Sequence, residues 1–170
     1  MSVVAAVFLT TFKMVVGFLT GSLGILSEAL HSLLDFVAAF ITFIAVKISD
    51  KPADKDHNFG HGKIENLSAL IETGLLIATC VWIVYEALER LASGNTHIEV
   101  SFWAYAVVIT SICVDFFRSR ALMKAAKEHN SQALEADALH FSTDILSSAV
   151  VLAGLIMAHY GYFFADCVAA

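Results

Sequence analysis

Five long apolar stretches, separated by short polar segments, constrain the fold of this chain more than any other feature. They cover residues 3–19, 23–48, 67–88, 102–117 and 136–158, and a sixth stretch begins near residue 163. A helix of about 20 mostly apolar residues is long enough to cross a bilayer. The 170 residues are 58% hydrophobic and only 15% charged, far from the balance of a soluble domain. The sequence therefore predicts an all-α, polytopic transmembrane helix bundle with five complete spans and the start of a sixth.

Charge and cysteine content exclude several function classes. The net charge is −6 and no basic stripe occurs, so we expect no nucleic-acid binding. The cysteines are far apart and form no CxxC pair, which argues against a thiolate zinc site and against a disulfide framework. The sequence has no HExxH motif and no glutamate evidently placed as a general base beside a histidine pair, so we do not expect an enzyme.

The positive residues favour one orientation in the membrane. Eight of the ten lysines and arginines lie in or beside the polar segments 49–65 and 118–135, which alternating spans place on the same side. Lysine and arginine accumulate on the cytoplasmic side of membrane proteins, so we expect the N-terminus to be cytoplasmic as well. Because no targeting segment precedes the first span, we expect a bacterial inner (plasma) membrane.

Two of the apolar stretches each carry a histidine and an aspartate four residues apart. The pairs are His31–Asp35 and His140–Asp144. Residues four apart share a helix face, so the imidazole and the carboxylate of each pair point the same way. At about 1.5 Å per residue both pairs lie roughly 14 to 20 Å into their helices, close to the middle of a bilayer. Ionisable residues at that depth are costly and by default mark a functional site.

Three interpretations of the pairs are open. They are intrahelical hydrogen bonds that fix helix packing, a proton relay without a metal, or the two halves of a metal site. Two nitrogens and two oxygens from two facing helices would complete a tetrahedral zinc site, which makes the metal site our main hypothesis. Imidazole suits a borderline ion such as Zn²⁺ better than it suits Mg²⁺ or Ca²⁺, while Fe²⁺, Co²⁺ and Cd²⁺ are also compatible with these ligands.

A second candidate metal cluster lies in the polar segment between the second and third spans. It consists of Asp54, His57 and His61, with Asp56 as an alternative carboxylate. The glycines beside His61 make the backbone permissive, so the two histidines can converge without a regular helix. Three ligands would leave a fourth position for water, as in an exchangeable zinc site. The alternative is a solvated loop with ordinary surface histidines.

These motifs together resemble those of a known family. The sequence is similar to the cation diffusion facilitators, which are metal-exporting secondary transporters. The resemblance rests on three segments and covers essentially the whole chain: GSLGILSEALHSLLD, DHNFGHGKIENLSAL and SQALEADALHFSTDILSS. It implies a six-helix transmembrane bundle followed by a cytoplasmic ferredoxin-like domain, assembled as a homodimer, that exchanges a cytoplasmic divalent cation for protons.

The resemblance also implies a role for each candidate residue. The transport site of the family, between its second and fifth helices, matches His31, Asp35, His140 and Asp144, and its loop site matches Asp54, His57 and His61. Histidine in both pairs resembles the zinc-preferring branch. We therefore expect residues 1–170 to be a cation-efflux transmembrane domain that is incomplete at its C-terminus and lacks the cytoplasmic domain.

The predicted function is that of a secondary transporter that exports a divalent transition-metal cation, most readily Zn²⁺, from the cytoplasm in exchange for protons. Zn²⁺ requires neutral imidazole and ionised carboxylate, so its binding releases protons. Histidine ordinarily titrates near pH ~6.5, so protons and metal compete for it close to neutrality. The expected partners are metal cations, protons, membrane lipid and a second copy of the chain in a homodimer. The alternative is a non-transporting metal-binding or regulatory membrane subunit that pairs with a full-length partner.

Overall fold

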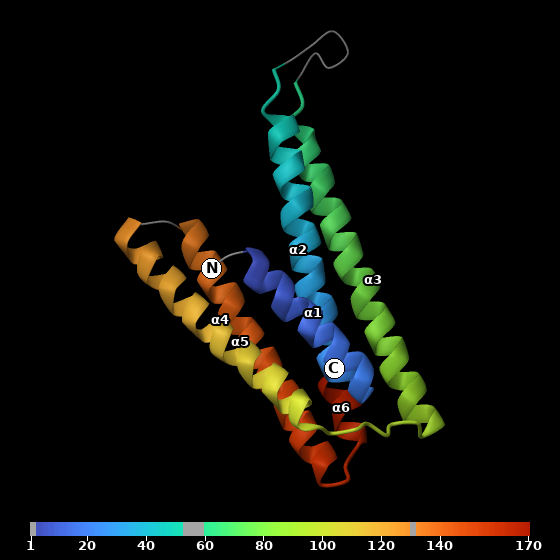
Figure 1. Cartoon of the computed structure of the whole chain (residues 1–170). Coiled ribbons are helices and arrows are strands. Elements are labelled where there is room, and N and C mark those ends of the chain that lie inside the picture. Colours follow the sequence, from blue (N-terminus) through green and yellow to red (C-terminus); the bar gives the residue numbers. More distant parts are fainter. Residues whose placement is uncertain (1–2, 53–59, 130–131) are drawn as a thin grey trace. The chain divides into compact units, whose positions relative to one another are not determined.

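The computed structural model describes residues 3–52, 60–129 and 132–170, and helices form its regular structure (Figure 1). In chain order they are α1 (Val3–Thr20), α2 (Leu23–Ser49), α3 (Lys63–Ser93), α4 (Phe102–His129), α5 (Gln132–His159) and α6 (Phe164–Ala169). No strand occurs in the described residues. The predicted all-α class is therefore confirmed, and α6 begins where the start of a sixth helix was predicted.

Three helices within the described ranges are long and apolar enough to cross a membrane. They are Leu23–Ser49, Asn66–Ser93 and Asp137–His159, and α1 supplies a shorter apolar segment, Ala6–Thr20. The predicted span 102–117 forms the first part of α4. That helix then continues through the polar residues Arg118 and Arg120 to His129, so its apolar part stays short. The chain is thus a membrane protein, and the count of five complete spans stays a prediction.

The chain divides into two compact units. The first unit combines Met1–Ala29 with Tyr85–Ala170, and the second unit is Leu30–Val84. Helices α2 and α3 each contribute residues to both units. The first unit therefore holds α1, α4, α5 and α6 with the start of α2 and the end of α3, and the second unit holds the remainder of α2 and α3.

The first unit is built on α4 and α5, which pack along each other, while α1 packs on α4 and α6 packs on α5. The contact between α5 and α6 requires a glycine. A Cβ atom at Gly154 would lie 2.7 Å from the Cβ of Ala169, closer than two carbon atoms approach. Gly154 therefore lets α6 lie directly against α5. The apolar core of this unit includes Val16, Ile25, Val107, Val108, Val151 and Leu155.

Buried polar contacts fix the point where α2 begins. Asp166 of α6 is fully buried, and its carboxylate accepts hydrogen bonds from Ser22 Oγ at 2.6 Å and from Leu23 N at 2.7 Å. The backbone N–H groups of a first helical turn have no partner within their own helix, and a carboxylate there also complements the helix dipole. Asp166 therefore acts as an N-terminal cap that another helix supplies to α2.

The second unit is an antiparallel pair formed by most of α2 and α3 (Figure 1). Thr42 Oγ1 of α2 donates a hydrogen bond to Glu72 Oε1 of α3 at 2.6 Å. Large apolar side chains such as Phe40, Phe43 and Leu70 are exposed on these helices. A helix that is apolar around most of its circumference suits a lipid environment, in agreement with the apolar composition of both helices.

Candidate metal centre

The two histidine–aspartate pairs have matching geometry in the structure. His31 Nε2 lies 3.7 Å from Asp35 Oδ2 on α2, and His140 Nε2 lies 3.7 Å from Asp144 Oδ2 on α5. The side chains of both histidines are 44% exposed. Both pairs lie within continuous helices, so the prediction that the two members of each pair share a helix face is confirmed.

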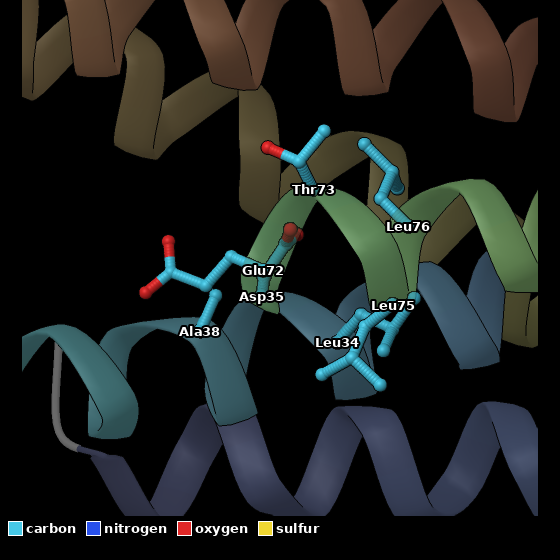
Figure 2. Close-up of a pocket in the computed structure, with 7 residues that line it drawn as sticks. All are labelled: Leu34, Asp35, Ala38, Glu72, Thr73, Leu75 and Leu76. Carbon is cyan, nitrogen blue, oxygen red and sulfur yellow. The ribbon is translucent and has the colours of Figure 1, made fainter. Parts of the chain in front are cut away.

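The first pair belongs to the second unit, and its aspartate, Asp35, lines a pocket of about 260 Å³ between α2 and α3 (Figure 2). Asp35 comes from α2 and Glu72 from α3, so two carboxyl groups share the pocket. The hydrogen bond from Thr42 holds Glu72 in place. The remaining lining side chains are mainly apolar: Leu34, Ala38, Thr73, Leu75 and Leu76. The pocket therefore combines two carboxyl groups with mainly apolar side chains.

The second pair belongs to the first unit, where the contact between α4 and α5 sets its orientation. Ser119 Oγ of α4 donates to the carbonyl of Ala138 at 2.8 Å and lies 2.8 Å from Ser142 Oγ. The guanidinium of Arg118 lies 3.9 Å from the centre of the Phe141 ring. These contacts flank His140 on α5 and fix the rotation of the helix that carries it.

The structure therefore brings His31 to Asp35 and His140 to Asp144, each pair within its own unit. Imidazole nitrogen and carboxylate oxygen suit Zn²⁺ and related borderline ions, so each pair can supply two ligands. The convergence of the two pairs on one ion stays a prediction.

The loop cluster is described only in part. Asp54 and His57, with the alternative ligand Asp56, lie outside the described residues. His61 precedes α3, and its carbonyl accepts a hydrogen bond from Ile64 N at 3.0 Å. Gly60 beside it has φ +75°, a conformation that glycine adopts without strain. The three-ligand cluster stays a prediction.

One charged pair was missed when the sequence was interpreted. Lys13 Nζ of α1 lies 3.3 Å from Glu28 Oε2 of α2, and each side chain is only 6% exposed. Both residues interrupt apolar stretches, which is the signal that could have drawn attention to them. Their pairing could not be read from spacing, because they lie on different helices.

Comparison with known proteins decides the family. A family model described as the cation efflux transmembrane domain matches residues 1–170. The chain belongs to the cation-efflux family. This confirms the predicted resemblance to the cation diffusion facilitators.

Relatives with curated names agree with this assignment. An uncharacterized transporter of Methanocaldococcus jannaschii is 36% identical over 169 residues, covering 99% of this chain and 59% of the relative. Magnetosome protein MamB of Paramagnetospirillum magneticum is 35% identical over 98% of this chain and 56% of the relative. Cation-efflux pump FieF of Shewanella oneidensis is 34% identical over 97% of this chain and 55% of the relative. The relatives named for an activity are transporters, and none of these names specifies zinc.

The chain spans about half the length of the curated relatives it matches. The family and the apolar helices together identify a membrane protein of a transition-metal cation efflux family. The ion, the counter-ion and the assembly of the whole protein are matters for proposal.

Proposed function

We propose that this chain is the translocating domain of a secondary transporter that exports a divalent transition-metal cation, most readily Zn²⁺, in exchange for protons. The observation that carries the proposal is the pair of matched histidine–aspartate contacts on apolar helices of a cation-efflux family member. An ionisable pair inside a membrane helix is costly unless it serves a ligand or a partner, and two such pairs of equal geometry suit a shared ion.

In this proposal His31, Asp35, His140 and Asp144 provide two nitrogens and two oxygens to one tetrahedral ion. Imidazole and carboxylate donors favour Zn²⁺, and the same set accepts Fe²⁺, Co²⁺ or Cd²⁺. The aspartates offset the charge of the ion where the surroundings have a low dielectric constant. Asp54, His57 and His61 would receive the ion on the cytoplasmic side before it enters the membrane.

Exchange with protons follows from the same ligands. A metal ion binds the deprotonated imidazole, so loading the site from the cytoplasm releases protons. When the site opens to the other side, protons compete for His31 and His140 and the metal leaves. Rocking of helices around a fixed central site would alternate the access, as in other secondary transporters.

We propose that these residues form five complete spans and the start of a sixth, with the N-terminus in the cytoplasm. The distribution of lysine and arginine supports that orientation. We place the protein in a bacterial inner membrane and expect it to work as a homodimer within membrane lipid.

A flux assay in proteoliposomes tests the proposal. Metal-sensitive and pH-sensitive dyes would report both ions for the wild type, His31→Ala and Asp144→Ala. His159→Ala would serve as a control, because His159 ends α5 fifteen residues beyond Asp144. We expect Zn²⁺ flux with opposite proton flux in the wild type and the control, and no flux in the two site variants. Wild-type flux in the site variants would contradict the assigned ligands. Zn²⁺ binding without flux in the wild type would favour a metal-binding subunit.

A further inference from the structure

The arginine beside the second histidine–aspartate pair has no part in the proposed ligand set. Arg118 lies on α4, and its guanidinium carbon is 3.9 Å from the centre of the Phe141 ring on α5. The centre of that ring is 5.6 Å from the centre of the ring of its neighbour, His140. The two distances, 3.9 Å and 5.6 Å, together place the guanidinium no more than 9.5 Å from this imidazole.

Further contacts between α4 and α5 hold the guanidinium in this place. Ser119, the next residue on α4, is buried. Its Oγ donates to the carbonyl of Ala138 at 2.8 Å and lies 2.8 Å from Ser142 Oγ. The positive charge of Arg118 is attracted to the face of the Phe141 ring in addition. The position of the charge beside His140 is therefore fixed by contacts on both helices.

The positive charge of Arg118 is not neutralised by an ion pair. Within residues 3–52, 60–129 and 132–170, no carboxylate lies within ion-pair distance of its guanidinium. Asp115, three residues earlier on α4, accepts a hydrogen bond from Ser111 Oγ at 3.4 Å. Arginine keeps its proton in proteins, so the charge beside His140 is permanent.

A permanent positive charge near a metal ligand lowers the affinity of the site for any cation. A divalent ion bound to His140 would lie roughly 10–12 Å from the guanidinium, since a zinc–nitrogen bond adds about 2 Å. At the dielectric constant of water, the repulsion over that distance lowers the affinity about three- to fourfold, and where less water is present it lowers the affinity further. A site that passes an ion on must bind it weakly enough to release it.

We propose that Arg118 sets the metal affinity of the site that contains His140 and Asp144. Its fixed charge weakens the binding of a divalent cation and so speeds the release of that cation, without any bond between Arg118 and the ion. The proposal rests on the proposed function, which places the ion at these ligands. Removal of the charge should therefore tighten metal binding, whereas removal of a ligand or of a packing contact would weaken it.

Calorimetric titration of Zn²⁺ into the purified 170-residue chain at low salt tests the sign of the effect. Arg118→Met keeps an apolar side chain against Phe141 and removes the charge, so we expect the dissociation constant to fall about three- to fourfold or more. Arg118→Lys keeps the charge and should stay within about twofold of the wild type. Unchanged or weaker binding in Arg118→Met would overturn the proposal, and so would equal tightening in Arg118→Lys.

Arg120→Met is the matched control. Arg120 lies on the same helix and also stacks on an aromatic ring, but that ring belongs to Phe116 of α4 itself, at 5.2 Å. Arg120 is exposed, so water screens its charge. We expect this variant to bind Zn²⁺ within about twofold of the wild type. A tightening equal to that of Arg118→Met would overturn a specific role of Arg118.

Two further measurements separate the effect of charge from an effect on structure. Raising the salt concentration from about 0.01 M to 1 M shortens the screening length from about 30 Å to 3 Å, so the difference between wild type and Arg118→Met should shrink. A difference independent of salt would overturn the electrostatic mechanism. Phe141→Leu removes the ring that holds the guanidinium, so it should also tighten binding, and an unchanged affinity would overturn the proposal even if Arg118→Met fails to fold.

The flux assay tests the role in release. Arg118→Met should lower both the Zn²⁺ concentration that gives half-maximal flux and the maximal flux, because a tighter site fills sooner and empties more slowly. A maximal flux equal to that of the wild type would overturn the role in release. Wild-type Zn²⁺ binding without flux would contradict the proposed function, while the affinities still decide the role of Arg118. Absence of wild-type Zn²⁺ binding would contradict both.

Discussion

Replacement of Asp166 by alanine should strongly destabilise the first unit, because it removes the cap from the start of α2. The carboxylate accepts two short hydrogen bonds, from Ser22 Oγ at 2.6 Å and Leu23 N at 2.7 Å, while the contact from Gly24 N at 3.5 Å is at the limit. Hydrogen bonds to a charged acceptor contribute about 1.5–3 kcal/mol each, so we expect Asp166→Ala to lower the free energy of unfolding by roughly 3–6 kcal/mol.

The free energy of unfolding can be measured in detergent micelles by titration with a denaturing detergent, followed by circular dichroism. Asp166→Asn keeps the shape and one acceptor oxygen, so we expect a smaller loss of about 1.5–3 kcal/mol. Asp137→Asn, at an exposed carboxylate, should change stability by no more than about 0.5 kcal/mol. A loss below about 1 kcal/mol in Asp166→Ala would contradict the capping role.

Three further outcomes follow from the described contacts. Gly154→Ala should lower the free energy of unfolding by about 1–3 kcal/mol, because the added Cβ would collide with Ala169. The control is Gly74→Ala on α3, where a Cβ meets nothing within 4 Å, so this change should be neutral or stabilising. Equal effects of the two changes in the same unfolding titration would contradict the close contact of α5 and α6. Ser119→Ala should lower the free energy of unfolding by about 0.5–1.5 kcal/mol, because the hydrogen bond to the carbonyl of Ala138 is lost. A neutral result would show that the hydrogen bond from Ser142 is enough to satisfy the same carbonyl. The affinity for Zn²⁺ should fall as the pH is lowered, because a protonated imidazole cannot bind the metal. Calorimetry in buffers of different ionisation enthalpy should detect the protons that Zn²⁺ releases on binding. An affinity independent of pH would exclude the histidines as ligands.

Local pattern was enough to predict the helices and the geometry of each histidine–aspartate pair. Apolar stretches of the length of a membrane span placed α2, α3 and α5, and the spacing of four residues placed His140 beside Asp144. The helix α4 continues beyond its apolar stretch. Its apolar part stops at Phe117, but helix-favouring residues such as Ala121 and Lys124 carry it on to His129.

Contacts between distant segments could not be predicted in the same way. Asp166 caps a helix whose first residues lie more than 140 positions earlier in the chain, and no local pattern links the two. Lys13 interrupts the first apolar stretch, yet its partner on the next helix depends on how α1 and α2 pack. Tertiary packing decides which residue a buried charge pairs with. The sequence therefore shows that such a charge is unusual, but it does not identify the partner.

The central claim is that the two histidine–aspartate pairs bind one metal ion together, and calorimetric titration of Zn²⁺ tests it most directly. The measurement would compare the purified 170-residue chain with His31→Ala, His140→Ala and the double variant. A shared site predicts that each single variant loses the same binding event and that the double variant loses nothing more, because the effects of residues on one site are not additive. Independent, additive losses in the two single variants would show that each pair binds on its own, and unchanged binding in the double variant would assign the pairs to helix packing.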